Sequence, residues 1–363
     1  MNRKTETTTM VNKYALHDLT GFGTSLLVAA GLNHQRAQVM AQVFLEADLM
    51  GFSTHGLNRV ASNLDWLLSG QSRCEGEPQI LSDRGNTFNW DAQFLPGPWV
   101  VSLAIDVAME RVAQRGLVAA TIRRSQHIAA LAAYCPKVVE AGYIILMSCS
   151  TPAENTVCAP TGITPLLSAN PIAFAAPADD YPLLFDISMS VTAGGYVARA
   201  LREGKPMPEP CLKDNQGRIT DQPQAFFDEP GGSILPIGGL SHGYKGFALG
   251  IAAEVMSMAL GGYGRADSES RNDGEANSVF LQIIDPAAFG SLAAFKRELG
   301  AQRQLCEDSQ VAQGQEAVRF PGQRAWQRRR QQTQHGVELY PEIMVDLTRW
   351  ANRLGVEAPT PIG

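Results

Sequence analysis

The sequence of 363 residues predicts a mixed α/β fold. Apolar residues recur at helical spacing over residues 35–50, and from residue 106 onward helical and strand patterns alternate. The composition, with 45% hydrophobic and 18% charged residues, is typical of a globular protein with ample material for a core. We therefore expect one large domain or two interleaved domains.

The first predicted helix covers residues 35–50, because Val39, Val43 and Ala47 recur at helical spacing and Asn33 precedes them as a candidate cap. Later apolar runs are short, as in buried strands. The other expected elements are, in chain order, a helix over Asp106–Arg115, a strand over Leu117–Ile122, a helix over His127–Gly142, strands over Tyr143–Ser148, Ile172–Ala176 and Leu183–Phe185, long surface connections over residues 202–243, a buried helix over Tyr244–Leu260 and a strand over Val279–Ile284.

The net charge of −6 and the isoelectric point near 5.6 argue against a general nucleic-acid binder. The stretch Arg324–Arg330 is basic, and we interpret it as a solvated arm or a helix with a charged face. No apolar run approaches the length needed to span a membrane. We therefore expect no nucleic-acid partner and no membrane partner, and a flexible tail over residues 1–10.

Several patterns that would indicate a specific chemistry are absent. The six cysteines show no C-x-x-C pair, so we expect no bound metal, reduced thiols and a cytoplasmic location. The dinucleotide fingerprint G-x-G-x-x-G is missing, which disfavours a classical Rossmann domain. The phosphate-binding G-x-x-x-x-G-K-[ST] loop, the H-E-x-x-H zinc motif and the G-x-S-x-G nucleophile motif are missing as well.

The stretch from Thr54 to Arg59 carries the most chemical information. His55 and Arg59 are four residues apart and would share one face of a helix. An imidazole exchanges protons near neutral pH, and a guanidinium holds a carboxylate with two parallel hydrogen bonds. Together they suit a small acid with a carbonyl or hydroxyl group next to its carboxylate, whereas the alternative is a capping histidine beside a solvated arginine.

Four further stretches place polar residues at the ends of predicted elements, and each also has a purely structural interpretation. His127 lies at a strand-to-helix junction, where it could donate a hydrogen bond to a ligand or act as a core residue. Asn170 could bind an amide or a ribose, but Asn-Pro also marks a turn. Asp186 could accept from a ribose or cap a helix. Lys245, between small residues, could bind phosphate at a helix start or belong to a turn.

Taken together, these residues resemble the malate/L-lactate dehydrogenase family of NAD(P)-dependent oxidoreductases, from about residue 14 to 350. Six markers occur in the family's order: the element at 54–59, His127, Asn170-Pro171, Asp186, Lys245-Gly246 and Pro321-Gly322-Gln323. The resemblance implies an α/β malate/L-lactate dehydrogenase-like fold with a non-Rossmann nicotinamide-binding domain and discontinuous helical and mixed domains. It also implies a homodimer with the active site near the subunit interface.

By this resemblance His55 would move the proton and Arg59 would hold the substrate carboxylate, with Thr54 beside them. His127 is the acid or base in part of the family, so both histidines remain candidates. The cofactor, NAD or NADP, would contact Ser150, Asn170, Asp186, Ile187, Ser188, Lys245, Gly246, Pro321, Gly322 and Gln323.

Several positions depart from the usual family pattern. Thr54 stands where serine is common, Ser168-Ala169 replaces Gly-Thr, and Ile128 follows His127 in place of glycine. A tyrosine often found after the arginine is missing, with Asn63 and Leu64 near that place. The tract from His127 to Leu131 most resembles the cyclic imino acid reductases. These departures bear on the substrate more than on the cofactor.

We therefore expect an NAD(P)-dependent oxidoreductase that acts on a small 2-oxo or 2-hydroxy carboxylate. The alternative within enzymes is a reductase of a cyclic imino acid such as piperideine-2-carboxylate or pyrroline-2-carboxylate. A non-catalytic protein that kept the dinucleotide site is the alternative from another class. The expected parts are the tail 1–10, an N-terminal helical substrate part 11–120, a mainly NAD(P)-binding part 121–260, and a C-terminal part 261–363 that returns to the first domain.

Overall fold

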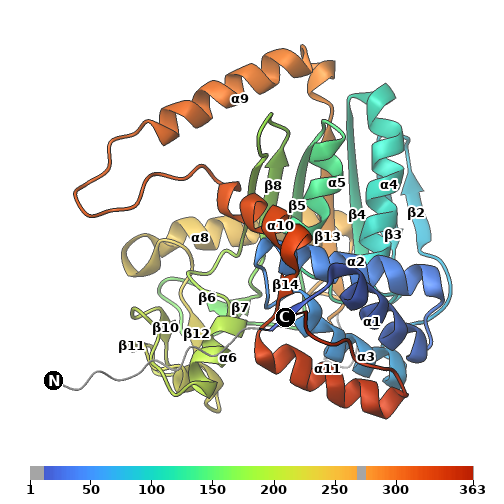
Figure 1. The fold of residues 1–363 in the computed structure, drawn as a ribbon. Helices are drawn as coiled ribbons and strands as arrows, with labels where there is room; N and C mark the ends of the chain where they lie inside the picture. Colours follow the sequence, from blue (N-terminus) through green and yellow to red (C-terminus); the bar gives the residue numbers. More distant parts are fainter. Residues whose placement is uncertain (1–11, 268–274, 363) are drawn as a thin grey trace.

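A seven-stranded sheet forms the centre of the molecule in the computed structural model, which describes residues 12–267 and 275–362 (Figure 1). The strand order is β2-β3-β4-β13-β5-β8-β9. Strands β3 and β4 pair in parallel and the other neighbours pair antiparallel. The strands are β2 (Gln79–Asp83), β3 (Thr87–Asp91), β4 (Leu117–Ser125), β5 (Ile144–Ser150), β8 (Ile172–Ala176), β9 (Leu183–Ile187) and β13 (Asn277–Ile284).

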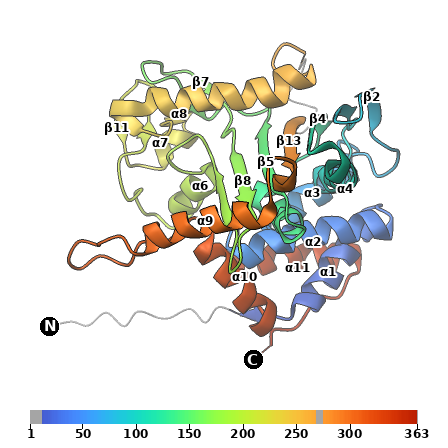
Figure 2. The same cartoon turned by 90° about the horizontal axis from the view of Figure 1, so that it is seen from above.

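Helices cover both faces of this sheet, which gives the α/β class that the sequence predicts. Helix α4 packs on β4 and β13, α8 packs on β5, and the π-helical turn η3 packs on β5 and β13. Figure 2 shows α8 on one side of the sheet and α1 and α2 on the other. The helices of the main body are α1 (Leu16–Ala29), α2 (His34–Met50), α3 (Val60–Ser69), α4 (Gly97–Arg115), α5 (Cys135–Glu140), α8 (Gly239–Glu254), η3 (Val255–Ala259), α9 (Leu292–Glu307), α10 (Gln323–His335) and α11 (Pro341–Leu354), with 3-10 turns η1 (Leu57–Arg59), η2 (Leu131–Tyr134) and η4 (Pro286–Ala288).

A smaller five-stranded sheet lies beside the main one, in the order β11-β10-β12-β6-β7. Its own core contains Val197, Met207, Leu212 and Ile234. The chain here was expected to form long connections over residues 202–243, and the structure corrects this expectation with short elements. Those within residues 202–243 are β10 (Leu212–Lys213), β11 (Ile219–Thr220), α7 (Gln224–Phe227) and β12 (Ser233–Ile234). The earlier elements of this part of the molecule are β6 (Val157–Cys158), β7 (Pro165–Leu167) and α6 (Gly194–Arg202). A separate pair joins β1 (Lys13–Tyr14) to β14 (Val337–Glu338).

The predicted helix over residues 35–50 is confirmed as α2, and the Asn33 side chain caps it by accepting from the Arg36 N–H at 2.9 Å. The predicted strands correspond to β4, β5, β8, β9 and β13, with ends that differ by a few residues. The predicted helix over Asp106–Arg115 is confirmed as the second half of α4. The predicted tail over residues 1–10 lies outside the described residues.

The predicted helix over His127–Gly142 is wrong in its first half. The chain has no regular secondary structure up to Ala130, with Ala129 at a φ of 64°, and becomes helical only from Leu131. All residues from Ile128 to Tyr134 are buried. Apolar side chains are therefore required on every side of this segment, so their frequency says nothing about helical periodicity.

The helix predicted over Tyr244–Leu260 is present as α8 and η3, but it is not buried throughout. Tyr244, Ile251 and Val255 lie on its exposed side, and α8 runs along the outer edge of the molecule in Figure 2. Gly250 is buried against Leu167. None of the helices within residues 12–267 and 275–362 is long and apolar enough to cross a membrane.

The basic stretch Arg324–Arg330 is part of α10, which packs against α2 and is not a solvated arm. Trp326 is buried in the main core. Arg329 forms ion pairs with Glu46 and, at 3.1 Å, with Glu140. The charge in this stretch is therefore partly neutralised within the chain.

Candidate active site

The polar residues singled out in the sequence gather at one edge of the seven-stranded sheet because of its pairing. Strands β4 and β5 are both antiparallel to β13, and β9 is antiparallel to β8, which is antiparallel to β5. The carboxyl ends of β4, β5 and β9 therefore meet at the same edge, together with the amino ends of β8 and β13. His127, Ser150 and Asp186 lie at these three carboxyl ends.

A cavity of about 270 Å³ opens at this edge, and we call it the sheet-edge cavity. Residues from the α2–α3 connection and from the five ends just described line it together. The predicted site residues in its wall are Thr54, His55, Arg59, His127, Ser150, Asn170, Asp186 and Ser188. The wall does not include the other six, which are Ile187, Lys245, Gly246, Pro321, Gly322 and Gln323.

The segment from Thr54 to Arg59 is a turn that ends in a short 3-10 helix, so His55 and Arg59 do not share an α-helical face. The buried carboxylate of Asp48 supports this turn by accepting from the Leu57 N–H at 2.7 Å. Gly56 lies so close that a Cβ atom there would meet the Asp48 carboxylate at 2.3 Å. Glycine is therefore required at position 56 if Asp48 is to hold the turn.

Burial raises the pKa of Asp48 from 3.8 to about 7, and this sets an expected pH dependence of stability. Between these values the folded protein keeps a proton that the unfolded chain has lost, so folding stability falls as the pH rises. Asp48→Asn mimics the protonated carboxyl at every pH. We expect the free energy of unfolding of the wild-type protein to fall relative to that of the variant by at most about 1.4 kcal/mol per pH unit between about pH 4 and 7.

Urea unfolding at several pH values measures this difference. Asp65→Asn, on the exposed side of α3, is the matched control and should follow the wild-type protein. Parallel pH profiles for wild type and Asp48→Asn would show that Asp48 ionises freely in the folded protein.

His55 and His127 stack in the cavity with ring centroids 5.6 Å apart. Removal from water and the charge of Arg59 lower the pKa of His55 to about 3 and hold the pKa of His127 well below its usual value, so both rings are neutral near pH 7. Their hydrogen bonds differ. His127 Nδ1 accepts from the Ala129 N–H at 3.1 Å, whereas His55 Nδ1 lies 2.8 Å from the Thr54 hydroxyl, which can donate or accept.

Arg59 is the cation of the cavity wall. Its Nε is buried and has no hydrogen-bond partner among the described residues. The Arg59 charge lowers the pKa of both histidines and of Glu275, so its guanidinium lies within electrostatic reach of all three. A buried donor of this kind is satisfied when a ligand carboxylate enters the cavity.

Asp186 and Asn170 line the cavity, but their side chains already make hydrogen bonds within the chain. Asp186 Oδ2 accepts from the Ala132 N–H at 2.9 Å at the start of η2, and desolvation raises its pKa to about 6. Asn170 donates to the Gly250 carbonyl at 3.0 Å and to Glu254 at 3.2 Å, and accepts from Ser168. Both donor hydrogens of Asn170 are therefore used inside the protein.

Of the other predicted cofactor residues, the structure brings only Ser150 and Ser188 into the cavity wall. The Ser150 hydroxyl is buried and lacks a hydrogen-bond partner in the described part of the chain, so it is free to meet a ligand. Ile187 and Lys245 are exposed, and Gly246 packs on the backbone of Ile237. Gly322, at a φ of 98°, packs on the Pro182 carbonyl at the beginning of β9.

Two carboxylates in the cavity wall, Glu154 and Glu275, were not identified from the sequence. Glu275 comes just before the strand predicted over Val279–Ile284, and Glu154 follows the strand predicted over Tyr143–Ser148. Acidic residues near strand ends are common in loops, so only their convergence on Arg59 distinguishes them.

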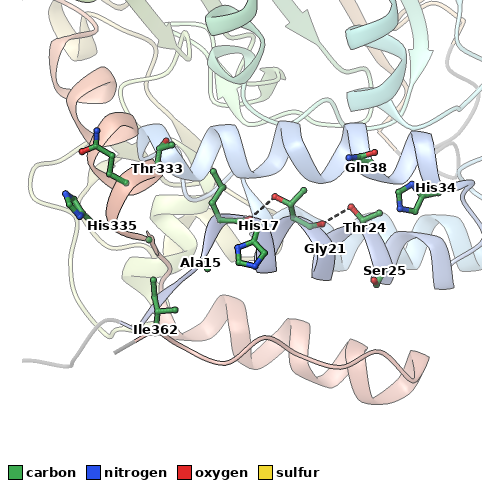
Figure 3. Close-up of a pocket in the computed structure, with 14 residues that line it drawn as sticks. Ala15, His17, Gly21, Thr24, Ser25, His34, Gln38, Thr333, His335 and Ile362 are labelled. Carbon is green, nitrogen blue, oxygen red and sulfur yellow. Dashed lines mark hydrogen bonds between the residues drawn. The ribbon is translucent and has the colours of Figure 1, made fainter.

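A larger hollow of about 860 Å³ lies between α1, α2 and the end of α10, away from this chemistry (Figure 3). Figure 3 shows His17, His34 and His335 around it, with hydrogen bonds along α1 from Thr20 and Thr24 to backbone carbonyls. It contains none of the predicted site residues. The site is therefore assigned by its chemistry and not by cavity size.

A half-buried guanidinium beside two neutral imidazoles suits a small carboxylate that gains or loses a proton, which is the class of ligand that 2-hydroxy-acid dehydrogenases take. Residues 14–348 match the sequence model of the malate/L-lactate dehydrogenase family, and the chain belongs to this family. The predictions of an oxidoreductase and of NAD or NADP as its cofactor are confirmed at this level.

Three similar proteins illustrate the range of the family. An L-lactate dehydrogenase from Cupriavidus necator is 29% identical, over 96% of this chain and 99% of its own length. A Delta(1)-pyrroline-2-carboxylate reductase from Ancylobacter novellus is 28% identical, over 88% of this chain and 92% of its own. The crystal structure of malate dehydrogenase from Entamoeba histolytica has the same fold, with a TM-score of 0.90, 20% identity, and coverage of 97% of this chain and 100% of that one.

Proposed function

We propose that this chain transfers a hydride between NAD(P) and the second carbon of a small 2-oxo or 2-hydroxy carboxylate, in the sheet-edge cavity. The observation that carries the proposal is the unpartnered buried Nε of Arg59, which lies in the same cavity wall as the stacked rings of His55 and His127. When bound, the reduced cofactor supplies the hydride. The protein residues bind the acid, orient it and move the proton.

Arg59 would hold the substrate carboxylate. A carboxylate accepts two parallel hydrogen bonds from a guanidinium, and this fixes the direction of the adjacent carbon. The negative charge would also offset the effect of Arg59 on the pKa of His55. Substrate binding would therefore make His55 easier to protonate.

The hydrogen bonds of the two histidines favour different roles. Because His127 Nδ1 accepts from the Ala129 N–H, its proton is on Nε2, and the neutral ring is a hydrogen-bond donor for the substrate oxygen. If His127 Nδ1 were protonated, its N–H would point at the Ala129 N–H, and neither donor would have an acceptor. His55 meets a hydroxyl that suits either state, so His55 would give the proton to the carbonyl oxygen in reduction and take it back in oxidation.

The cofactor would lie along the carboxyl ends of β5 and β9. We propose contacts from the Ser150 hydroxyl and from Ser188, Asn170 and Asp186, which line the cavity. We propose further contacts, outside the cavity wall, from Ile187, Lys245, Gly246 and the Pro321–Gln323 turn, which lies at the amino end of β9. Gln323 Oε1 is buried without a hydrogen-bond partner among the described residues, which fits a contact of this kind. NAD and NADP both remain candidates.

Reduction of a cyclic imino acid is the second candidate function. The tract from His127 to Leu131 favours it, because this tract lines the cavity and most resembles the imino acid reductases. NADH and NADPH oxidation with pyruvate, oxaloacetate, piperideine-2-carboxylate and pyrroline-2-carboxylate, together with NAD and NADP reduction by the hydroxy acid ureidoglycolate, separates the two functions. Turnover of the oxo or hydroxy acids supports the 2-oxo or 2-hydroxy acid dehydrogenase, and turnover of the cyclic imines supports the imino acid reductase. No turnover of any of these compounds would count against both functions.

The assembly is proposed to be a homodimer, and the exposed apolar side chains along α8 and η3 support an interface there. Leu240, Tyr244, Ile251 and Val255 are between 41% and 63% exposed. We expect light scattering to give twice the chain mass of 39.2 kDa for the wild-type protein and 39.2 kDa for Ile251→Glu. Leu305→Glu, on the exposed side of α9, should stay dimeric, and a monomeric wild-type protein would contradict the proposal.

We also propose a cytoplasmic location. We further propose that the chain divides into the parts 11–120, 121–260 and 261–363 predicted from the sequence. The location is supported by six free thiols, of which Cys135, Cys149, Cys158 and Cys211 are buried. The division has to accommodate the seven-stranded sheet, which combines β2 and β3 with strands from later parts of the chain. Limited proteolysis of the holoenzyme, with mapping of the stable fragments, tests the division.

A further inference from the structure

Glu154 and Glu275 place negative charge in the wall of the sheet-edge cavity, together with Arg59. Neither residue has a place in the hydride-transfer scheme above. Glu275 lies two residues before β13 and Glu154 lies in the connection after β5, so both approach from the same sheet edge as His127. The cavity wall therefore has one cationic group, Arg59, and, in addition to Asp186, two further carboxylates around a volume of about 270 Å³.

The backbone of Glu275 is held firmly. Its N–H donates to Gln126 Oε1 at 3.1 Å, and its carbonyl accepts from the Thr151 hydroxyl. Gln126 is fully buried and is itself held by the Gln71 carbonyl, at 2.7 Å from Nε2. The carboxylate of Glu275, by contrast, has no hydrogen bond or ion pair with the residues that the structure describes.

The charges around Glu275 come from two sides. Arg59 lowers its pKa, while desolvation and the neighbouring charge of Glu154 raise it, to about 7. Arg59 is thus near Glu275 without forming an ion pair with it in the described part of the chain. An acid held by Arg59 shares the cavity with both glutamates, and a second anionic group on that acid would be repelled by them.

We propose that Glu275, assisted by Glu154, selects acids with a single negative charge, whose far end is neutral or donates hydrogen bonds, and discriminates against acids with a second anionic group such as oxaloacetate and malate. This selection rests on the proposed function for the position of Arg59 against the substrate. A hydroxyl or amine at the far end can donate to the free Glu275 carboxylate, whereas a second carboxylate cannot. Glu275 is in this scheme a specificity-determining residue.

The test compares oxaloacetate with 2-oxo-4-hydroxybutyrate, which has the same chain length and a hydroxymethyl group in place of the second carboxylate. We expect Glu275→Gln to raise the ratio of kcat/KM for oxaloacetate to kcat/KM for the hydroxy acid by about tenfold or more. Glu154→Gln should change it in the same direction and by less. Glu342→Gln, on the exposed side of α11, is the matched control and should leave the ratio unchanged.

The pH dependence gives a second readout. In the wild-type protein, discrimination against oxaloacetate should strengthen as the pH rises through about 7, since Glu275 then becomes charged. The other titratable or charged groups of the wall are Glu154, Asp186, Arg59, His55 and His127, and Asp186, with a pKa of about 6, is already largely charged at that pH. Glu275→Gln should lose this dependence. An unchanged substrate ratio in Glu275→Gln, or a wild-type protein that prefers oxaloacetate, would overturn the proposal.

Failure of the proposed function gives a different result. If the holoenzyme reduces none of the 2-oxo acids, calorimetric binding of malonate and of its half-amide to the NADH-loaded protein replaces the rate measurement. We expect the half-amide to bind more tightly to the wild-type protein and the difference to shrink in Glu275→Gln. Equal affinity for both ligands, or binding of neither, would overturn the selection by Glu275.

Discussion

Arg59→Ala is expected to lower kcat/KM for a 2-oxo acid by about a hundredfold to a thousandfold while leaving NAD(P)H binding unchanged. The guanidinium Nε is buried and lacks a partner in the described chain, so its hydrogen bonds are available for a substrate carboxylate. Losing a charge-assisted pair in a desolvated cavity costs about 2–5 kcal/mol, and each 1.4 kcal/mol corresponds to about tenfold. Steady-state kinetics and fluorescence titration with NADH measure the two effects separately.

Arg59→Lys should fall between alanine and wild type, because a lysine keeps the charge but cannot make two parallel hydrogen bonds. Arg84→Ala removes an exposed arginine of the same part of the chain and serves as the control, with no expected change. Addition of guanidinium ions should partly restore turnover to Arg59→Ala. An alanine variant with a wild-type KM would remove Arg59 from substrate binding.

His55→Gln is expected to lower kcat by about a hundredfold or more, which is the usual contribution of a positioned acid or base. The protein should still bind NADH, because the cavity wall keeps its other groups. In the wild-type protein the low pKa of His55, about 3 without substrate, means that the protonated ring becomes rarer as the pH rises. Reduction should therefore slow with rising pH, whereas oxidation, which uses the neutral ring, should change little above about pH 5, and His55→Gln should lack the trend in reduction.

His127→Gln separates the roles of the two histidines. Glutamine keeps a neutral donor for the substrate oxygen, so we expect a loss of only about tenfold and an unchanged pH profile. Thr54→Ser should preserve the hydroxyl beside His55 Nδ1, and Thr54→Val should remove it. If His127→Gln lost the pH dependence of the rate and His55→Gln kept near wild-type activity, His127 would be the residue that transfers the proton and His55 the hydrogen-bond donor.

Much of the local structure could be predicted because it depends on neighbouring residues. The cap at Asn33, the helix over residues 35–50 and the strand over Ile172–Ala176 follow from spacing and capping, which need no information about distant parts of the chain. The resemblance to the family could also be recognised, since its markers at Arg59, His127 and Asp186 occur in a set order.

The structure differs where distant contacts override local pattern. His127 to Ala130 is not helical although it is rich in helix-forming residues, because the segment is buried on all sides and the His127 ring accepts a hydrogen bond from the Ala129 N–H. The basic residues around Arg329 suggest solvent exposure, yet Glu46 and Glu140 lie against them. Neither acid is near this stretch in the sequence.

The chemical groups of the site can be read from the sequence: a guanidinium at Arg59, imidazoles at His55 and His127, and the order of elements that carries them. Which of these groups meet depends on the packing of the folded chain. Antiparallel pairing with β13 brings the ends of β4 and β5 to one edge, and there Glu275 joins Arg59. Hydrogen bonding and electrostatics act over a few ångströms, so the tautomer of His127 and the charge opposite Arg59 depend on contacts between residues far apart in the chain.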